Sequence, residues 1–339
     1  MVGIVDYGFY IPKYKITIDE IAKVWGKRTA DIENSLNIKE KTVSSIDEDS
    51  LTMAYEASSM ALNNFPDIKK IQVVLFGSET HPYAVNPAST ILAEFLGIEK
   101  NYLAYDTEFA CKAGTSAVIS ALALIKSDFS ENALVVASDK ATGRPHDSLE
   151  YTASSGAVSL LLGKKDVIVE VIDYQSFSSD TPDFWRREGI RYPSHGGRFS
   201  GKPSYFYHIQ EATKNIFKKN NLTSERFNYG IFHMPNGKFP INVASSLGFT
   251  KKQIEKSLVV PYLGNSYTAS ALMGLVSVLE VAKENDLIYF CSYGSGAGSD
   301  AFILKVTKHL DKKRKYFSNY LINKKYISYI QYLKFMNAI

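Results

Sequence analysis

The sequence predicts an α/β protein made of two similar halves. Segments typical of buried strands alternate with helical segments along most of the 339 residues, which is the pattern of a mostly parallel or mixed sheet covered by helices. The same order of elements recurs after 154 residues. With 45% hydrophobic and 22% charged residues, the composition is that of a globular protein and excludes a disordered or fibrous one.

In the first half, short apolar runs predict strands, and segments with helical spacing or small residues predict helices. The run Ile71–Gly77 is long enough for a buried strand and too short for a core helix. Thr17–Trp25 begins with a polar capping residue and spaces its apolar residues as a helix does. In order, the predicted elements are the strand Val2–Ile11, the helices Thr17–Trp25 and Leu51–Leu62, the strand Ile71–Gly77, the helix Ala88–Leu96, the strand Tyr102–Asp106, the helix Cys111–Ile125 and the strands Ala133–Ser138 and Ala157–Leu162.

The second half repeats this order with different residues. Ser266–Ala282 is a small-residue, apolar segment like Cys111–Ile125, and a buried strand follows each of them. In order, the predicted elements are the strand Val167–Tyr174, the helix Tyr205–Asn220, the strand Tyr229–His233, the helices Ile241–Leu247 and Ser266–Ala282, and the strands Leu287–Ser292 and Ala301–Val306.

Four polar residues occupy equivalent positions in the two halves. Glu79 ends a buried strand of the first half, and Cys111 opens a small-residue helix 32 residues later. His233 and Asn265 stand in the same relation, each 154 residues further on. The halves share almost no sequence identity, so the repeat is one of architecture and predicts a pseudo-twofold axis. Because open α/β sheets bind ligands at such ends, these four residues are candidate site residues.

Charge distinguishes a C-terminal extension from these halves. The net charge is +4, but residues 307–339 alone carry eight basic residues and one acidic residue, Asp311. The other 306 residues carry 31 basic and 34 acidic residues, which is not the balance of a nucleic-acid-binding domain. We predict an N-terminal half at residues 1–165, a C-terminal half at residues 166–306, and a basic, Tyr-rich extension at residues 307–339.

The sequence argues against several classes of protein. Its two cysteines, Cys111 and Cys291, cannot form a disulfide framework, and the spaced Cys, His and acidic motifs of metal sites are missing. The longest apolar run, Ala117–Ile125, is far shorter than the ~18 residues of a membrane span. The N-terminus lacks the basic start of a signal peptide. We therefore expect a cytoplasmic protein without a metal ion.

The glycine-rich segment Gly294-Ser-Gly-Ala-Gly-Ser does not fit the binding of a dinucleotide. Its third glycine is misplaced, and a strand rather than a helix follows at Ala301. We interpret the segment as a turn between strands that allows a substrate to approach the backbone closely.

Cys111 and Glu79 are the candidates for covalent and acid–base chemistry. A thiol at the start of a helix is acidified by the helix dipole, and the neighbouring Lys112 adds positive potential, so Cys111 is a candidate nucleophile. The alternative is an inert, buried cysteine. Glu79 follows an apolar run, where loss of hydration would raise its pKa towards that of a general base. The alternative is a carboxylate on a surface loop.

His233 and Asn265 are the candidates for binding a carbonyl group. His233 stands where a strand runs into a Pro-Asn-Gly turn, and an imidazole there could pair with a thiolate or polarise a carbonyl. It could equally be a structural histidine. The amide of Asn265 could orient a carbonyl oxygen, or it could cap the helix that follows.

Several motifs resemble those of the thiolase superfamily and, within it, the 3-hydroxy-3-methylglutaryl-CoA synthases of the archaeal type. The resemblance covers essentially the whole chain, including the Tyr-rich ending. It implies a thiolase-like fold, in which two pseudo-twofold-related α/β halves form a layered αβαβα core. The matching motifs are Glu108-Phe-Ala-Cys-Lys-Ala-Gly-Thr, Phe232-His-Met-Pro-Asn-Gly-Lys-Phe-Pro, Leu263-Gly-Asn-Ser-Tyr-Thr, Ser292-Tyr-Gly-Ser-Gly-Ala-Gly-Ser-Asp-Ala-Phe, Gly77-Ser-Glu-Thr and Gly197-Arg-Phe-Ser-Gly-Lys-Pro-Ser-Tyr-Phe.

The resemblance implies a role for each candidate residue. Cys111 would accept the acetyl group of acetyl-CoA as a thioester, and Glu79 would act as general base and acid at the acetyl methyl group. His233, helped by Asn265, would hold and polarise the ketone of acetoacetyl-CoA. Water would then release 3-hydroxy-3-methylglutaryl-CoA for the mevalonate route to isoprenoids. Both CoA thioesters are substrates, so no cofactor is implied. The binding positions of the family fall on Thr152, Ser200, Ser295 and Lys238, the last as a contact for a CoA phosphate.

The sequence departs from this family at one position near Lys238. After Lys238-Phe-Pro-Ile the family pattern usually has an arginine, but Asn242 stands here. An arginine would bind a phosphate through a charged, two-pronged group, whereas asparagine has neither the charge nor the reach. We therefore expect Lys238 to supply more of the attraction for phosphate than it does in relatives.

Two other enzymes of the superfamily are alternatives. Thiolases use a second cysteine near the last glycine-rich turn, but Ser292 takes that position and Cys291 is one residue away, on the opposite side of the strand. We therefore interpret Cys291 as a buried, structural residue. Ketoacyl-carrier-protein synthases of the initiating type use Cys, His and Asn but lack the acid at Glu79, and they are the nearer alternative.

The extension leaves open an alternative of another class, a non-catalytic or RNA-binding subunit. Its Lys312-Lys-Arg-Lys run is followed by interleaved tyrosines and lysines, a composition that could bind RNA. We favour a solvated helix that docks on the body or on a partner protein. All four candidate residues are present, whereas a catalytically inactive subunit should lack at least one of them.

Partner proteins are implied only by the resemblance. The superfamily implies a homodimer core. Archaeal relatives imply a complex with acetoacetyl-CoA thiolase and a small zinc-containing scaffold protein. We expect neither a nucleic acid nor a membrane as a partner.

Overall fold

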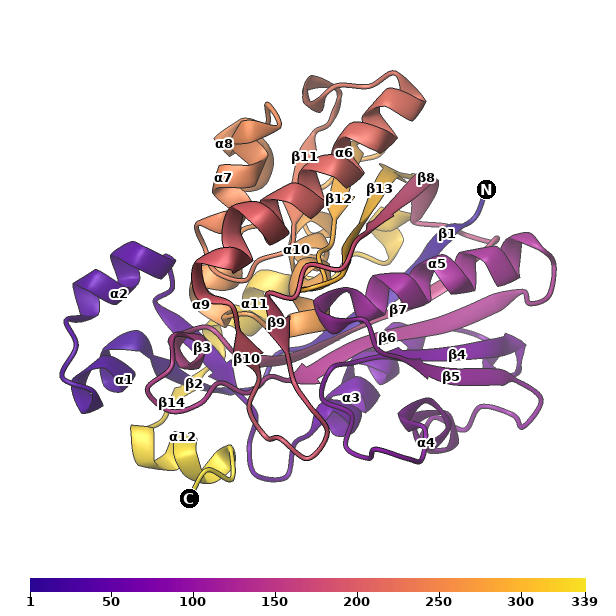
Figure 1. Cartoon of the computed structure of the whole chain (residues 1–339). Helices are drawn as coiled ribbons and strands as arrows, with labels where there is room; N and C mark the ends of the chain where they lie inside the picture. Colours follow the sequence, from indigo (N-terminus) through magenta and orange to yellow (C-terminus); the bar gives the residue numbers. More distant parts are fainter.

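The computed structural model describes the backbone of residues 1–339 and every side chain except that of Arg198. Its main sheet has nine strands in the order β11-β12-β13-β8-β1-β7-β6-β4-β5 (Figure 1). The strands are β1 (Gly3–Tyr10), β4 (Ile71–Gly77), β5 (Leu103–Thr107), β6 (Asn132–Lys140), β7 (Ser155–Gly163), β8 (Val169–Ser178), β11 (Tyr229–Phe232), β12 (Leu287–Cys291) and β13 (Gly298–Val306).

The pairing pattern repeats in the two halves of this sheet. In the first half, β4 is parallel to β6, β6 is antiparallel to β7, and β7 is antiparallel to β1. In the second half, β11 is parallel to β12, β12 is antiparallel to β13, and β13 is antiparallel to β8. The repeat confirms the predicted α/β fold of two similar halves. The domain boundaries at residues 165 and 306 stay a prediction.

The two halves of the sheet join through a short contact between β1 and β8. Gly3 pairs with Glu170, and Ile4 pairs with Val169. A Cβ atom on residue 3 would lie 2.1 Å from the carbonyl oxygen of Val169, so only glycine allows this approach. The junction makes one continuous sheet out of the two halves.

Helices cover both faces of the sheet and fill the space between its halves. The largest hydrophobic core combines residues of α5 (Ala113–Lys126) and α10 (Ser270–Leu279) with strand residues from both halves, so these two helices form the central layer. Separate cores form under α3 (Ser50–Leu62) and α4 (Ala88–Phe95) on one outer side, and under α6 (Tyr207–Asn220) and α7 (Phe239–Ser246) on the other. Figure 1 shows α6 and α7 at the top of the molecule and α3 and α4 at the bottom, with α5 between them.

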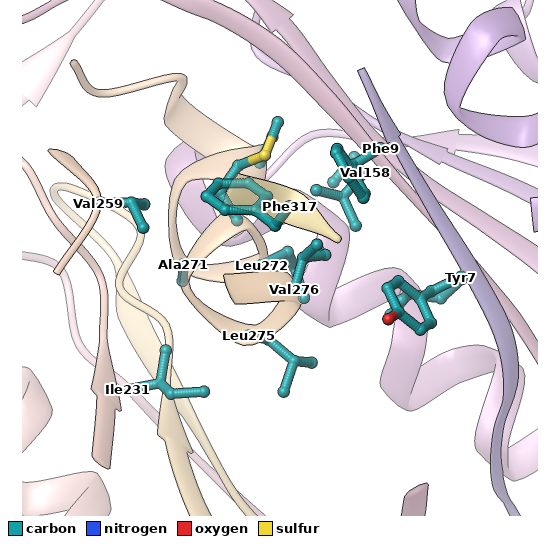
Figure 2. Packing of buried hydrophobic residues seen from close by; sticks show 14 of the residues in the cluster. Tyr7, Phe9, Val158, Ile231, Val259, Ala271, Leu272, Leu275, Val276 and Phe317 are labelled. Carbon is teal, nitrogen blue, oxygen red and sulfur yellow. The ribbon is translucent and has the colours of Figure 1, made fainter. Parts of the chain in front are cut away.

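The central helix α10 is buried along its whole length. Figure 2 shows Leu272 and Val276 facing Phe9 and Val158, which belong to β1 and β7 of the other half. All ten residues of α10 are buried, and each fully buried Leu or Val contributes about 1.5–3 kcal/mol through the apolar area that it removes from water. The packing of α10 is therefore a main source of the cohesion between the halves.

The structure differs from the sequence prediction where the two buried helices begin. A 3₁₀ turn, Ala110–Lys112, precedes α5, and a second one, Tyr267–Ala269, precedes α10. Ala110 and Tyr267 both have positive φ angles, of 45° and 47°, and such angles end regular helical geometry. The predicted helices Cys111–Ile125 and Ser266–Ala282 were therefore too long at their N-terminal ends.

Several short elements were not predicted, because they are too short to show a periodic pattern. They are the strands β2 (Tyr14–Thr17), β3 (Glu40–Val43), β9 (Phe184–Trp185) and β10 (Ser194–His195), and the helices α2 (Thr29–Leu36), α8 (Lys251–Ile254) and α9 (Val260–Leu263). The helix predicted over Thr17–Trp25 is α1 (Ile18–Val24), with the Thr17 side chain accepting a hydrogen bond from the Glu20 amide as its cap.

The C-terminal extension docks on the body. It forms α11 (Phe317–Ile322), β14 (Lys325–Tyr326) and α12 (Tyr329–Phe335), and β14 pairs with β2. Its basic side chains are used within the protein, since Lys313 and Lys315 form ion pairs with Asp6 and Lys324 forms one with Glu40. These contacts support the docking interpretation over the RNA-binding one.

None of the described helices is long and apolar enough to cross a membrane. Among the described side chains, no group of three or more His, Cys, Asp and Glu residues is arranged to hold a metal ion.

Candidate active site

A cavity of about 340 Å³ is lined by residues from both halves of the chain. Glu79 lines two neighbouring cavities instead, of about 820 and 680 Å³. Lys238 is exposed at the surface and does not line the 340 Å³ cavity. The 340 Å³ cavity brings together six of the eight residues predicted for the site, namely Cys111, Thr152, Ser200, His233, Asn265 and Ser295.

Cys111 lies in the 3₁₀ turn before α5, and its side chain is buried. The prediction of an acidified thiol was wrong for the free protein, because burial and the neighbouring Glu79 carboxylate raise the pKa of Cys111 well above its usual range. The positive charge of Lys112 does not offset this effect. Its Nζ atom is buried 3.0 Å from Oδ1 of Asp300, so its charge is already paired.

Glu79 follows β4 and lies beside Cys111, as the mutual influence of the two groups on their pKa values shows. Burial, and next the nearby Asp139 carboxylate, raise the pKa of Glu79 well above the usual range. This is the direction that the sequence predicted. Its Oε1 atom is buried and has no hydrogen-bond partner among the described residues. A buried, unpaired carboxyl oxygen of this kind suits a group that exchanges a proton with a substrate.

Asp139 at the end of β6 fixes the backbone around Glu79, and the sequence analysis missed it. Its Oδ1 atom accepts hydrogen bonds from the Glu79 amide at 2.8 Å, from the Ser78 hydroxyl at 2.7 Å, and from the amide and hydroxyl of Thr80. Its Oδ2 atom accepts one from the Thr268 amide of the other half at 2.9 Å. An acid at the end of a buried strand was the signal in the sequence that could have identified it.

His233 follows β11 and is fully buried. Its backbone amide donates to the Cys291 carbonyl at 2.9 Å, and its own carbonyl accepts from the Tyr205 hydroxyl at 2.6 Å. Burial lowers the pKa of His233 to about 3, so the imidazole is neutral at physiological pH. Its Nδ1 atom has no partner in the described part of the chain. A neutral ring that borders the cavity can donate one hydrogen bond to a carbonyl oxygen without carrying a charge.

Asn265 combines the two interpretations that the sequence left open. Its Oδ1 atom accepts from the Tyr267 amide at 3.0 Å and so fixes the turn before α10. Its backbone amide donates to the Thr152 carbonyl at 2.7 Å. With Oδ1 used by the turn, the side-chain NH₂ group is the part of the amide that can donate to a ligand.

Three further cavity residues escaped the sequence analysis. Asp183 is buried, and both of its carboxylate oxygens lie 3.2 Å from the hydroxyl of Tyr293. Tyr205 supports the His233 carbonyl. Asp183 lies in a stretch without a clear period, Tyr205 was identified only as the first residue of a predicted helix, and Tyr293 adjoins the glycine-rich turn. Their proximity to the predicted residues is therefore a result of the fold.

The assembled groups suit acyl transfer followed by carbon–carbon bond formation. A cysteine can take an acyl group covalently, and a carboxylate of raised pKa can remove a proton next to a thioester carbonyl. Neutral donors can stabilise the negative charge that develops on an attacked ketone oxygen. Cys111, Glu79, and His233 with Asn265 are the groups of these chemical types at the site.

Comparisons with known proteins agree with this chemistry. Residues 238–332 match the family "Hydroxymethylglutaryl-coenzyme A synthase C terminal". The chain is similar to the hydroxymethylglutaryl-CoA synthases of Methanocaldococcus jannaschii, with 46% identity over 343 residues, and of Methanosarcina barkeri, with 45% identity over 344 residues. Each comparison covers 100% of this chain and 99% of the relative.

The fold is also similar to a solved structure, MvaS in complex with 3-hydroxy-3-methylglutaryl coenzyme A. The TM-score is 0.90 at 23% sequence identity, over 99% of this chain and 91% of the other. This likeness in fold confirms the predicted thiolase-like architecture.

Proposed function

The chain belongs to the hydroxymethylglutaryl-CoA synthase family, and we propose that it condenses acetyl-CoA with acetoacetyl-CoA and water to give 3-hydroxy-3-methylglutaryl-CoA and CoA. The observation that carries the proposal is the cavity in which Cys111, His233 and Asn265 meet, with Glu79 beside the cysteine. The acid at Glu79 distinguishes this set from that of the initiating ketoacyl synthases. We expect the product to enter the mevalonate route and the reaction to take place in the cytoplasm.

The reaction proceeds through an acyl group on Cys111. The sulfur of Cys111 attacks the acetyl-CoA carbonyl, the thiol proton leaves, and CoA departs as the free thiol. Glu79 then removes a proton from the acetyl methyl group, and the resulting carbanion attacks the ketone carbon of acetoacetyl-CoA. His233 and Asn265 donate hydrogen bonds to the ketone oxygen, and the proton that Glu79 has taken passes to this oxygen, which becomes the 3-hydroxyl group. Water finally hydrolyses the thioester to Cys111, giving a free carboxylate and the cysteine thiol.

Thr152, Ser200 and Ser295 are proposed to bind the substrate from the walls of the cavity. The Thr152 hydroxyl donates to the Leu149 carbonyl at 3.3 Å, and the Ser200 hydroxyl donates to the Asp183 carbonyl at 3.4 Å. Both bonds are long, so both hydroxyls can turn towards a ligand at little cost.

Intact-mass measurement tests the proposed function directly. Incubation with acetyl-CoA should add the mass of one acetyl group to the protein. Subsequent addition of acetoacetyl-CoA should remove that mass and release 3-hydroxy-3-methylglutaryl-CoA, identified by liquid chromatography. An acetyl adduct that persists after acetoacetyl-CoA is added would contradict the proposal.

We expect Lys238→Ala to raise the apparent KM for both CoA substrates with little change in kcat, the signature of lost uniform binding. Lys238 is exposed at the start of α7, and Asn242, one turn later, is exposed on the same face. Asn242→Arg should lower the KM by up to roughly tenfold, because it adds a charge-assisted hydrogen bond. Steady-state kinetics of both variants check this, with the exposed Lys251→Ala on α8 as the control. If Lys238→Ala leaves the KM unchanged, residues other than Lys238 bind the CoA phosphate.

We also propose a homodimer core, and a complex with acetoacetyl-CoA thiolase and a small zinc-containing scaffold protein. The dimer is supported by β5, which lies at the edge of the sheet with one side unpaired, since exposed strand edges readily pair with another chain. The complex rests on the resemblance alone. Analytical ultracentrifugation of the purified chain, alone and with both partners, tests each association.

A further inference from the structure

Glu150 has a fully buried carboxyl group that two distant parts of the chain and the nearby His146 amide hold in place. It lies in the 3₁₀ turn Ser148–Tyr151 and is 0% exposed. Its Oε2 atom accepts hydrogen bonds from the His146 amide at 2.8 Å and from the Trp25 indole at 2.9 Å. Its Oε1 atom accepts one from the Tyr329 hydroxyl at 2.8 Å, and Tyr329 is the first residue of α12.

A second tyrosine of α12 reaches the same turn through Lys41. The buried Nζ atom of Lys41 donates to the backbone carbonyl of Glu150 and lies 3.2 Å from the hydroxyl oxygen of Tyr332. The side chain and the backbone of Glu150 are thus both tied to α12. A buried carboxyl group in such a site depends on every donor around it, because it has no water to replace a lost one.

The same turn supports the wall of the active-site cavity. Leu149 and Thr152 line the cavity on either side of Glu150. The carbonyl of Thr152 accepts the amide hydrogen of Asn265, and the amide of Ser154 donates to the Asn265 carbonyl at 3.0 Å. A shift of the Glu150 turn would therefore move Asn265 through the backbone that holds it.

We propose that Glu150 is a positioning residue for Asn265, and that the C-terminal helix α12 fixes it through Tyr329. The extension is then part of the active-site architecture, and its basic surface is incidental to this role. The kinetic part of the inference rests on the proposed function. Its structural part, that the Glu150 turn keeps the Asn265 amide in position, does not depend on the proposed function.

The variant Tyr329→Phe removes one hydroxyl donor and keeps the aromatic ring. We expect it to lower the condensation rate by roughly tenfold to a hundredfold, because small displacements of a positioning group have effects of this size. Acetylation of Cys111 does not use Asn265 and should proceed at the wild-type rate. The matched control is Tyr316→Phe, an exposed tyrosine of the same extension, which should leave both steps unchanged.

Amide hydrogen exchange at Asn265 tests the inference without any activity. Exchange at this amide should be about tenfold faster in Tyr329→Phe than in the wild type, because a hydrogen bond to a buried carboxylate has been lost. Glu150→Gln, which preserves the shape of the side chain, should also make hydrogen exchange at the Asn265 amide faster.

Unchanged exchange and unchanged condensation in both variants would overturn the inference. An equal loss of acetylation and condensation would also overturn it, because that result indicates partial unfolding instead of misplacement. A wild-type protein that makes no product, together with faster exchange in Tyr329→Phe, would support the inference and contradict the proposed function.

Discussion

Replacing Cys111 with serine will abolish the transfer of the acetyl group from acetyl-CoA to the protein. The alcohol is a far weaker nucleophile than a thiol, and the charge of the adjacent Lys112 is already paired with Asp300. Intact-mass measurement should show one acetyl adduct on the wild type and none on Cys111→Ser. Turnover should fall by more than roughly 10³-fold.

Cys291→Ser is the matched control for that experiment. Cys291 is fully buried in the core beneath α6, and burial raises its pKa to about 12. It does not line the cavity that contains Cys111. Acetylation and turnover should therefore stay near the wild-type level. An adduct that persists in Cys111→Ser and vanishes in Cys291→Ser would reverse the two assignments.

Replacing Glu79 with alanine should separate the two halves of the reaction. The Glu79 carboxylate is one of the causes of the raised pKa of the Cys111 thiol. Its removal makes the thiolate easier to form, so acetylation should persist. Condensation needs a base at the acetyl methyl group and should fall by about 10²–10⁴-fold.

Rapid-quench measurement of both steps checks this expectation. Glu108→Ala, which removes another acidic residue from one of the cavities that Glu79 lines, provides the control and should condense at close to the wild-type rate. If Glu79→Ala condenses normally, the general base lies elsewhere. If it cannot be acetylated, Glu79 acts on the thiol instead of on the methyl group.

Most of the fold was predictable because its strands and central helices are buried on both sides. The strand β4 lies between β6 and β5 and is apolar except at Gln72, and such a run can be recognised in the sequence. The starts of α5 and α10 were not predictable, because Ala110 and Tyr267 have positive φ angles, which residues other than glycine rarely adopt and which therefore leave no signal in the sequence. The short strands β9 and β10 have two residues each and carry no periodic signal.

The identities of the candidate residues were more predictable than their electrostatics. The start of a helix suggested an acidic thiol at Cys111, but burial and the Glu79 carboxylate outweigh the dipole. The sequence also could not show that Lys112 is neutralised by Asp300, 188 residues away. Asp139 escaped notice for the same reason, since one of its donors is the distant Thr268 amide.

The position of β1 in the sheet has a consequence for how the chain folds as it is made. This strand is synthesised well before its neighbours β7 and β8, which begin at Ser155 and Val169. Some 150 residues of nascent chain must therefore be synthesised before Tyr7 and Phe9 find their native partners. Contacts between such distant segments form slowly, and an unpaired apolar strand is prone to aggregate in the meantime. Completion of the sheet around β1 therefore waits until β8 (Val169–Ser178) has been made, so the nascent chain has the most to gain from a chaperone bound at β1.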